Sequence, residues 1–270
     1  MLSLPQGSRC AVSFAADWSA GDSPDSRQAY LASAATQIEA NQGRLQVFLA
    51  PDLLGNADAA PFLRDLSDRG HAVDLLVTCT ETPEEGAAQA LLTALKSGIE
   101  AFVQVGLPQP EGLRLSPMRR LGIQKHEGLQ KAVMDSGLGF VSSDHSTKQP
   151  PDPQEVGFAD KNAAMLIKHS QPRLYPSGLL EIPCPGYCDR NFFEVQGRPV
   201  DEWLAHVRGC VDFAHDMGGL MYAPWLELTV LAQNDPEGET LLTMLNHAAG
   251  RHEGEVVALT YRQAAEGSAL

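Results

Sequence analysis

The sequence predicts an α/β fold with a mostly parallel sheet, and three observations support this prediction. Several short segments are continuous apolar runs, which is typical of strands that helices cover on both faces. Segments with apolar residues at helical spacing lie between these runs, and the connections are short. Because parallel strands need crossover connections, this alternation indicates repeated strand–helix units in one sheet, either open or closed. With no internal repeat, we expect a single domain over residues 1–270.

The strand candidates are apolar and end at Gly, Pro or polar residues. The first run is followed directly by Ala15, Ala16, Asp17 and Trp18, at the end of a strand where a parallel sheet places its chemistry. We expect strands over 11–14, 45–50, 72–78, 113–115, 139–142, 179–183, 219–223 and 256–260.

The helix candidates are recognised by apolar spacing and by their ends. Tyr30, Ala34 and Ile38 follow one another at intervals of four residues, as on one face of a helix. Thr82 precedes a Pro-Glu-Glu start and has the chemistry of an N-cap, and Gly137 is typical of a helix end. We expect helices over 25–41, 59–69, 83–97, 126–136, 201–217 and 235–249.

Composition narrows the classes of partner. The chain has 43% hydrophobic residues and a net charge of −14, without the clustered Lys and Arg that nucleic acids and anionic membranes require. No apolar run approaches the roughly 18 residues of a membrane span, and the first residues lack a signal-peptide pattern. We therefore expect a cytoplasmic protein with neither nucleic acid nor membrane as a partner. A homo-oligomer is compatible with the sequence.

The five cysteines are an odd number and include no CxxC pair, which is typical of a reducing compartment. Cys184 and Cys188 flank a Pro-Gly turn that could bring their sulfurs together. Two alternatives remain open for this pair, namely a disulfide or metal clip and two independent thiols.

A family resemblance emerges when several segments are compared in order. The first strand ends in Ser13-Phe-Ala-Ala-Asp-Trp, and a helix then leads to Gly70-His71 before the strand at 72–78. The segment 111–144 contains Gly-Leu-Arg-Leu-Ser-Pro and a later Met-Asp-Ser-Gly-Leu-Gly-Phe, and 177–183 and 256–266 follow. The chain resembles the polysaccharide deacetylase family, also called the NodB-homology or carbohydrate esterase family 4 domain. The resemblance spans residues 10 to about 266. It implies a distorted (β/α) barrel of seven or eight mostly parallel strands.

The resemblance also implies a chemistry, which is hydrolysis of an amide or ester at an N-acetyl sugar with a divalent metal, usually zinc. The family uses a base and a metal-binding acid at the first strand end, two His ligands, and a late His beside Pro. On this sequence the base falls on Ala15, the His ligands on Leu76 and Thr80, and the late His on Ala223. Asp17 remains as the metal-binding acid. Because zinc needs at least three protein ligands, we expect neither a metal nor a cofactor at this site.

The remaining candidates lie at or just after predicted strand ends, which converge on one face of a parallel barrel. We expect Asp17, Trp18, Arg114, His145 and Trp225 around a single pocket. The alternatives are packing at the rim for Trp18, a backbone hydrogen bond for His145 and a salt bridge to an acid for Arg114. The catalytic candidates are Asp17 and His145, and the ligand-binding candidates are Trp18, Asp22, Arg114 and Trp225.

The histidines outside the strand ends predict no site. His247 and His252 are five residues apart, which does not match the four-residue spacing of a helical metal pair. We expect surface positions for His169, His206, His215, His247 and His252.

Two functions of different class follow. The first is a polysaccharide-deacetylase-like protein of carbohydrate metabolism that has lost the metal-dependent mechanism. Such a protein keeps a strand-end cleft for a glycan-like or small polar ligand, or for a protein partner. The alternative is an active hydrolase on a C–N or ester bond, with a rearranged site that uses Asp17, His71, Asp74 or His145.

Overall fold

The structure is a computed structural model, and it describes residues 3–19, 24–56, 58–79, 86–119, 121–145, 165–186 and 188–268. The strands form a three-stranded sheet in the order β11-β1-β9 and an eight-stranded sheet in the order β10-β2-β3-β4-β5-β6-β8-β7. Among the described strands, neighbours run parallel except for β7 and β8. The strands are β1 (Cys10–Val12), β2 (Ala15–Trp18), β3 (Gln46–Leu49), β4 (Ala72–Thr78), β5 (Gly112–Arg119), β6 (Phe140–Asp144), β7 (Arg173–Leu174), β8 (Leu180–Glu181), β9 (Met221–Tyr222), β10 (Leu226–Glu227) and β11 (Val256–Ala258).

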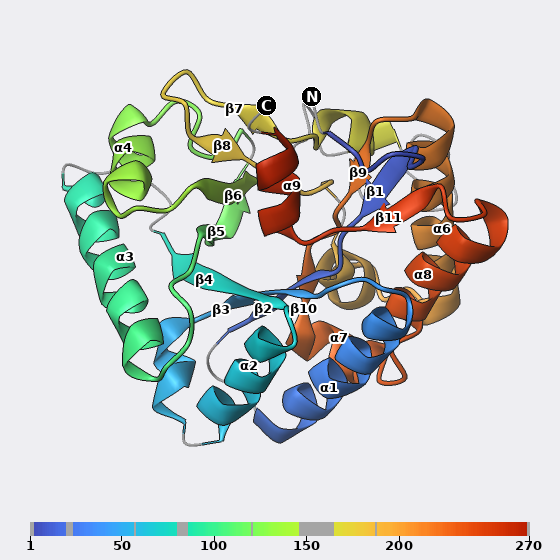
Figure 1. Cartoon of the computed structure of the whole chain (residues 1–270), viewed down its shortest axis with the longest axis horizontal. Helices are drawn as coiled ribbons and strands as arrows, with labels where there is room; N and C mark the ends of the chain where they lie inside the picture. Colours follow the sequence, from blue (N-terminus) through green and yellow to red (C-terminus); the bar gives the residue numbers. More distant parts are fainter. Residues whose placement is uncertain are drawn as a thin grey trace.

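Helices cover the outside of the curled sheets, while one C-terminal helix, α9, lies over their centre (Figure 1). The α-helices are α1 (Pro24–Ala40), α2 (Ala59–Asp68), α3 (Ala87–Gln104), α4 (Glu127–Asp135), α6 (Val200–Met217), α7 (Leu228–Asn234), α8 (Glu239–Arg251) and α9 (Tyr261–Ser268). Short turns of other helix types are η1 (Pro51–Gly55), η2 (Met165–His169) and η3 (Asn191–Val195).

The large sheet is strongly curled. Neighbouring strands lie about 4.8 Å apart, so β2 and β5 would be separated by roughly 14 Å on a flat sheet with β3 and β4 between them. Asp17 on β2 and Arg114 on β5 nevertheless form an ion pair of 2.7 Å. The sheet therefore closes around an interior, and the predicted distorted barrel of mostly parallel strands is confirmed.

Strand alternation divides the side chains between two apolar regions. On β2, Ala16 and Trp18 point to the main core under the helices, and Ala15 joins a second cluster inside the barrel. The same alternation on β4 sends Leu75 to the helices and Leu76 to the interior. The apolar face of α1 completes the main core with Tyr30, Leu31, Ala34, Ala35 and Ile38.

Each predicted strand overlaps an observed one, and β4 has the predicted bounds. The residues Ala15–Trp18, expected to follow the first strand, instead form a strand of their own, β2, and the short strands β7 and β10 are not predicted by the sequence. The predicted helix at 235–249 instead begins four residues later as α8. Its start is fixed by Asp235, whose carboxylate accepts the backbone N–H groups of Glu239 and Thr240 at 2.8 Å. The predicted helix at 83–97 is α3, shifted towards the C-terminus, with residues 83–85 outside the described part.

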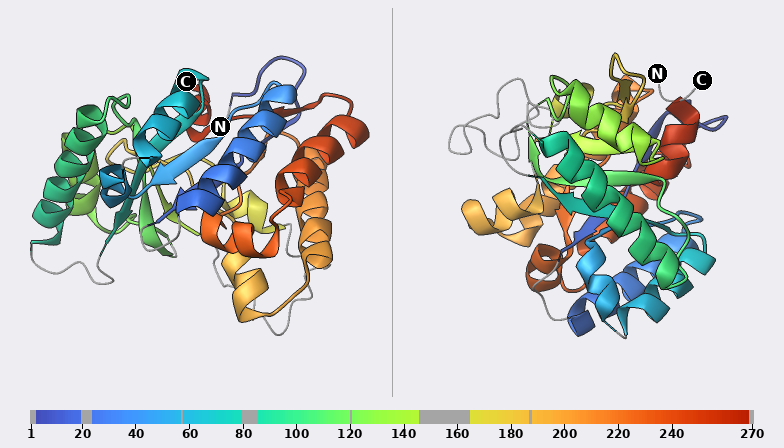
Figure 2. Two further views of the ribbon diagram at one scale, coloured as in Figure 1. Left: turned by 90° about the horizontal axis from the view of Figure 1, so that it is seen from below. Right: turned by 90° about the vertical axis from the view of Figure 1, so that its left-hand side faces the viewer.

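The described ends of the chain are close together (Figure 1), and the backbone N–H of Ser3 donates to Gly267 at 2.9 Å. Helices α6 and α8 lie side by side at one end of the molecule (Figure 2). The indole of Trp203 on α6 donates to the hydroxyl of Thr240 on α8 at 3.0 Å, which joins the two helices. Among the described helices, none combines the length and apolarity needed to cross a bilayer.

Candidate functional site

The barrel interior is apolar at the positions where the resemblance implies catalytic groups. Ala15, Leu76 and Ala223 belong to the same buried cluster, and none of them is more than 5% exposed. These residues come from β2, β4 and the end of β9, which are far apart in the sequence. The structure therefore brings the three positions together, and their side chains offer neither a proton acceptor nor a metal ligand.

An ion pair crosses this interior. Arg114 Nη1 donates to Asp17 Oδ1 at 2.7 Å, and the two side chains are 0% and 6% exposed. Burial raises the pKa of the Asp17 carboxyl, while the charge of Arg114 and a hydrogen bond from Trp225 act in the opposite direction. Burial lowers the pKa of Arg114, but the charges of Asp17, Cys184 and Tyr261 and the hydrogen bond to Asp17 together outweigh it and move that pKa above its usual value. The salt bridge that the sequence left open for Arg114 is therefore present.

Further contacts fix both members of the pair. Trp225 Nε1 donates to Asp17 Oδ2 at 2.9 Å, and Arg114 Nη2 donates to the hydroxyl of Tyr261 at 2.9 Å. The guanidinium also lies 4.3 Å from the centre of the Phe48 ring, in a cation–π contact. Three predicted site residues, Asp17, Arg114 and Trp225, are thus brought together in one network.

Trp18 lies on the opposite side of β2 from this network. Its side chain is 0% exposed and meets the ring of Phe62 on α2 edge to face, with centroids 6.3 Å apart. The expected position around the shared pocket is therefore wrong for Trp18. Because strand residues alternate between the two faces, neighbours such as Asp17 and Trp18 point in opposite directions. Trp18 is a core residue with no surface to offer a ligand.

Asp144 is the last residue of β6 and His145 follows it, but the two side chains differ in their surroundings. The Asp144 carboxylate accepts the backbone N–H of Leu121 at 2.8 Å and pairs with Arg173. His145 is half-buried and directly follows β6, and its role as a catalytic residue in the shared pocket remains a prediction. Asp22 lies outside the described residues, so its predicted role in ligand binding remains a prediction.

His71 and Asp74 have structural contacts away from the C-terminal strand ends. His71 Nδ1 accepts the backbone N–H of Leu45 at 2.9 Å, and Asp74 Oδ1 accepts that of Glu111 at 2.8 Å. Arg262 on α9 also pairs with Asp74 at 3.0 Å. Both residues therefore connect the N-terminal ends of strands. They are not part of a rearranged catalytic site at the C-terminal ends.

A cleft of about 420 Å³ lies at the C-terminal ends of β2 to β5. Leu76, one of the positions expected to be a His ligand, lies in its wall. Its polar lining comes from hydroxyl groups and one carboxylate. The described lining residues are Ser19, Ala50, Pro51, Asp52, Leu76, Val77, Thr78, Ala94 and Ser116.

The described residues of this region do not fit the family's zinc. Leu76 has no donor atom, and Asp17 is held by Arg114 and Trp225. Thr80 lies outside the described residues. Within the described ranges, a group of three His, Cys, Asp or Glu donors close enough for one metal is found at Asp212, His247 and His252. That group lies on and beside α6 and α8, and not in the barrel interior.

The sequence did not identify Glu227, the last residue of β10, which pairs in parallel register with Asp17 on β2. Glu227 Oε2 lies 2.6 Å from Arg190, and its side chain is 13% exposed. Burial raises the pKa of Glu227 to about 7. A carboxyl with a pKa near neutral pH is suited to proton transfer. The sequence carries no signal for Glu227, because β10 has only two residues and its position depends on pairing with β2.

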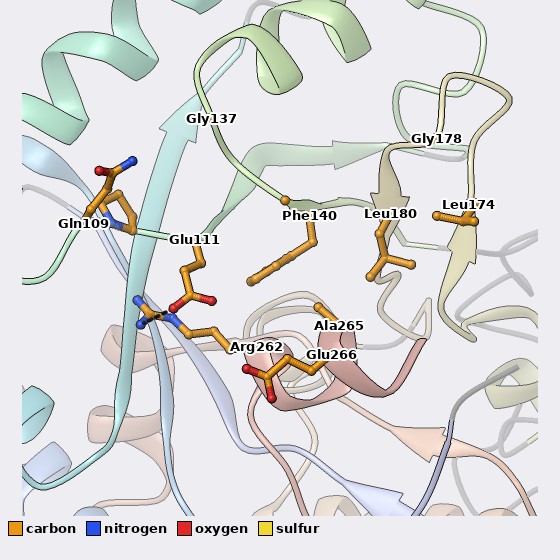
Figure 3. A pocket seen from close by; sticks show the side chains of 12 residues that line it. Gln109, Glu111, Gly137, Phe140, Leu174, Gly178, Leu180, Arg262, Ala265 and Glu266 are labelled. Atoms are coloured by element: carbon orange, nitrogen blue, oxygen red, sulfur yellow. Dashed lines mark hydrogen bonds and ion pairs between the residues drawn. The ribbon is translucent and has the colours of Figure 1, made fainter. Parts of the chain in front are cut away.

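A second hollow of about 500 Å³ lies at the other end of the barrel. Phe140 and Leu180 lie opposite Arg262 and Ala265 of α9, and Arg262 pairs with Glu111 at 3.2 Å (Figure 3). Phe140 and Leu180 begin their strands, so this hollow is at the N-terminal face. In parallel barrels that face contributes to stability, whereas catalysis takes place at the C-terminal face.

Comparison with solved structures identifies the fold. A putative polysaccharide deacetylase from Mycobacterium smegmatis has a TM-score of 0.66 at 18% identity, over 98% of this chain and 92% of that chain. The PuuE allantoinase has a TM-score of 0.65 at 14% identity, over 98% of this chain and 91% of that chain. A mutant of a carbohydrate esterase family 4 pseudoenzyme with restored enzymatic activity has a TM-score of 0.53 at 9% identity, over 97% and 69%.

Comparison of the sequence alone gives no match. No protein-family model matches it. No curated protein matches it either. The likeness therefore concerns the fold, which is the NodB-like distorted barrel of the polysaccharide deacetylases and of an allantoinase.

Proposed function

We propose that this protein does not carry out metal-dependent deacetylation and uses the cleft at its C-terminal strand ends to bind a glycan-like or small polar ligand. The observation that carries the proposal is the buried Asp17–Arg114 pair, surrounded by apolar residues where the family's mechanism needs a base and histidines. The five free cysteines support a reducing, cytoplasmic setting.

The first supporting argument concerns the missing donors. An alanine at position 15 accepts no proton from water, and a leucine at position 76 binds no metal. Ala223 likewise has no proton to give to a leaving group. Each step of the family's hydrolysis therefore lacks its group at the position that the resemblance assigns to it.

The second argument concerns the one acid that remains. Releasing Asp17 to bind a metal would leave the charge of Arg114 buried and uncompensated, which costs about 3–5 kcal/mol. A metal at this place would also bring a second positive charge close to the guanidinium. Arg114 therefore opposes metal binding here, beyond the mere loss of ligands.

The nature of the ligand follows from the lining of the cleft. Thr78 and Ser116 contribute hydroxyl groups and Asp52 a carboxylate, while Leu76 and Val77 supply an apolar wall. Hydroxyl and carboxylate groups beside an apolar surface suit a sugar ring, which has polar edges and an apolar face. The volume of about 420 Å³ accommodates a small ligand or one part of a longer glycan.

The first test measures acetate release from chitin oligosaccharides and acetylated xylan with added zinc. We expect no release above that of a heat-inactivated sample. Release that is abolished by a chelator, and is lost in an Asp17→Asn variant that circular dichroism shows to be folded, would contradict the proposal, because it would show a working metal-dependent site.

The second test locates ligand binding by calorimetry with chitin oligosaccharides. Ala50→Trp fills the cleft at the C-terminal strand ends, and we expect it to weaken binding at least tenfold. Ala265→Trp is the matched control, because it fills the hollow at the opposite end of the barrel. Binding that survives Ala50→Trp and is lost with Ala265→Trp would refute our assignment of the cleft.

Glu227 favours a second candidate function, a hydrolase acting on a C–N or ester bond without the family's metal site. With a pKa of about 7, this carboxyl is poised to take a proton from water and return it to a leaving group. Because one structure with this fold is an allantoinase, the substrate panel should include allantoin. Hydrolysis lost in Glu227→Gln, and kept in Glu194→Gln, would support this function, since Glu194 pairs with the same Arg190 from a more exposed position.

A further inference from the structure

A cluster of metal-ligating side chains lies on and just after helices α6 and α8, outside the barrel interior. Asp212 on α6 has its Oδ1 atom 2.7 Å from His247 Nε2 and 2.8 Å from His252 Nε2. One donor atom from each of the three residues lies within 4.8 Å of the other two. Two imidazoles and a carboxylate are a donor set that zinc and similar transition metals bind.

The end of α8 explains how histidines five residues apart converge. His247 lies within the helix, which ends at Arg251, and His252 follows with φ −116° and ψ 14°. The backbone therefore leaves the helical path at His252, and its ring turns towards Asp212. The expectation of a surface position is wrong for His206 and His252, which are 6% and 7% exposed. The argument from helical spacing does not apply beyond the helix end.

Neighbouring groups hold the His252 ring in place. The ring of His215 on α6 stacks on it with centroids 3.8 Å apart and planes at 24°. His215 Nε2 in turn lies 2.7 Å from Glu255 Oε2. Metal-binding histidines in proteins are oriented by such supporting contacts, which reduce the entropy lost on binding.

The donor atoms are close to the geometry that a metal requires. Bonds of 2.0–2.2 Å in a tetrahedral zinc site place neighbouring donor atoms about 3.4 Å apart. The separations of 2.7 and 2.8 Å must therefore widen by roughly 0.6 Å. Asp212 is 31% exposed and His247 is 17% exposed, so both side chains have room to move.

One positive group must leave when a cation binds. Arg251 Nε lies 3.0 Å from the same Asp212 oxygen, but its side chain is 63% exposed and can turn into solvent. An exposed ion pair of this kind contributes little to stability, so its loss costs little.

We propose that Asp212, His247 and His252 form a binding site for a divalent transition-metal ion, with zinc as the best fit and a water molecule in the fourth position. The bound ion joins α6 to the end of α8. This site is independent of the proposed function, because none of its residues lies in the barrel interior or lines the cleft.

The test uses the untagged full-length protein, stripped of metal by a chelator and titrated with zinc alone in a calorimeter. We expect one zinc per chain, and visible absorption bands of tetrahedral cobalt when cobalt replaces zinc. At a hundredfold excess over Kd, zinc should raise Tm by ~5–10 °C. The variants His247→Gln and Asp212→Asn should each weaken binding at least tenfold, with the metal-free Tm showing that they remain folded.

Two control variants separate this inference from the proposed function. His126→Gln removes a histidine at the start of α4, and Asp17→Asn changes the barrel interior; neither should alter zinc binding, with circular dichroism at the assay temperature showing that each variant is folded. Absence of zinc binding, or binding unchanged in both His247→Gln and Asp212→Asn, overturns the inference. Zinc binding lost in Asp17→Asn alone would overturn both this inference and the proposed loss of the family's metal site.

Discussion

Removal of either charge from the barrel interior should strongly destabilise the protein. Asp17→Ala leaves the Arg114 guanidinium, which is 0% exposed, without its carboxylate. The hydroxyl of Tyr261 and the Phe48 ring still contact the guanidinium, but neither supplies a negative charge. The perturbation therefore isolates a buried charge, which is among the most costly of single changes.

The size of the destabilisation follows from the burial of both side chains of the pair. Breaking a buried pair by removing one partner costs about 3–5 kcal/mol, whereas replacing both partners by apolar groups is often close to neutral. We expect Asp17→Ala to lower the free energy of unfolding by about 4 kcal/mol and Arg114→Met by about 3 kcal/mol. The double variant should be destabilised by at most ~2 kcal/mol, so the coupling energy is about 5 kcal/mol.

The assay is a double-mutant cycle by guanidinium chloride denaturation, followed by circular dichroism. The matched control is the Lys131–Asp135 pair on α4, whose side chains are 74% and 44% exposed. Its coupling energy should be about 0.3–0.5 kcal/mol. A coupling energy for Asp17 and Arg114 no larger than that of the control would refute the argument that the pair is a buried, charge-compensating unit.

Three further predictions concern other positions. Trp18→Ala should lower the free energy of unfolding by about 3–5 kcal/mol while leaving ligand affinity unchanged; a loss of affinity at equal stability would contradict its place in the core. The pKa of Glu227 is raised from 4.5 to about 7 on folding, so its contribution to stability is lost as pH rises through this window. The free energy of unfolding of Glu227→Gln should thus equal that of the wild type near pH 4 and exceed it by up to about 3 kcal/mol at pH 8, as measured by denaturation curves at each pH. An equal difference in the free energy of unfolding at both pH values would contradict this. Cys184 and Cys188 are buried thiols, so alkylation without reductant should add five groups to the denatured protein by mass and few to the native one; three groups would indicate a disulfide.

The sequence was sufficient for the parts of the fold that depend on local pattern. The strand at 72–78 is a continuous apolar run with clear ends, and it appears unchanged as β4. The strand β10 has two residues, Leu226 and Glu227, and a pair of residues has no periodicity to detect. Its position depends on parallel pairing with β2, which is a contact between distant parts of the chain.

The sequence predicts at which end of the barrel a site residue lies, because this follows from the order of parallel strands. It does not predict reliably to which face the side chain points. Asp17 and Arg114 are 97 residues apart and were expected at one end of the barrel because both follow the rule for parallel strands. The same rule places Trp18 there too, but alternation along β2 turns its side chain towards the helices. The four-residue spacing rule, which excludes a metal pair at His247 and His252, holds within a helix and not at its end.

The position of β1 has a consequence for the synthesis of the chain. This strand lies between β9 and β11, and Cys10 pairs with Val256, which is 246 residues later. At about 5–20 residues per second, a ribosome needs roughly 12 to 50 s to make that stretch. The strand β1 is made before both of its partners and can pair with neither until they follow. The small sheet is therefore completed only after synthesis has passed β11, whereas β2 to β6 can pair with one another much earlier.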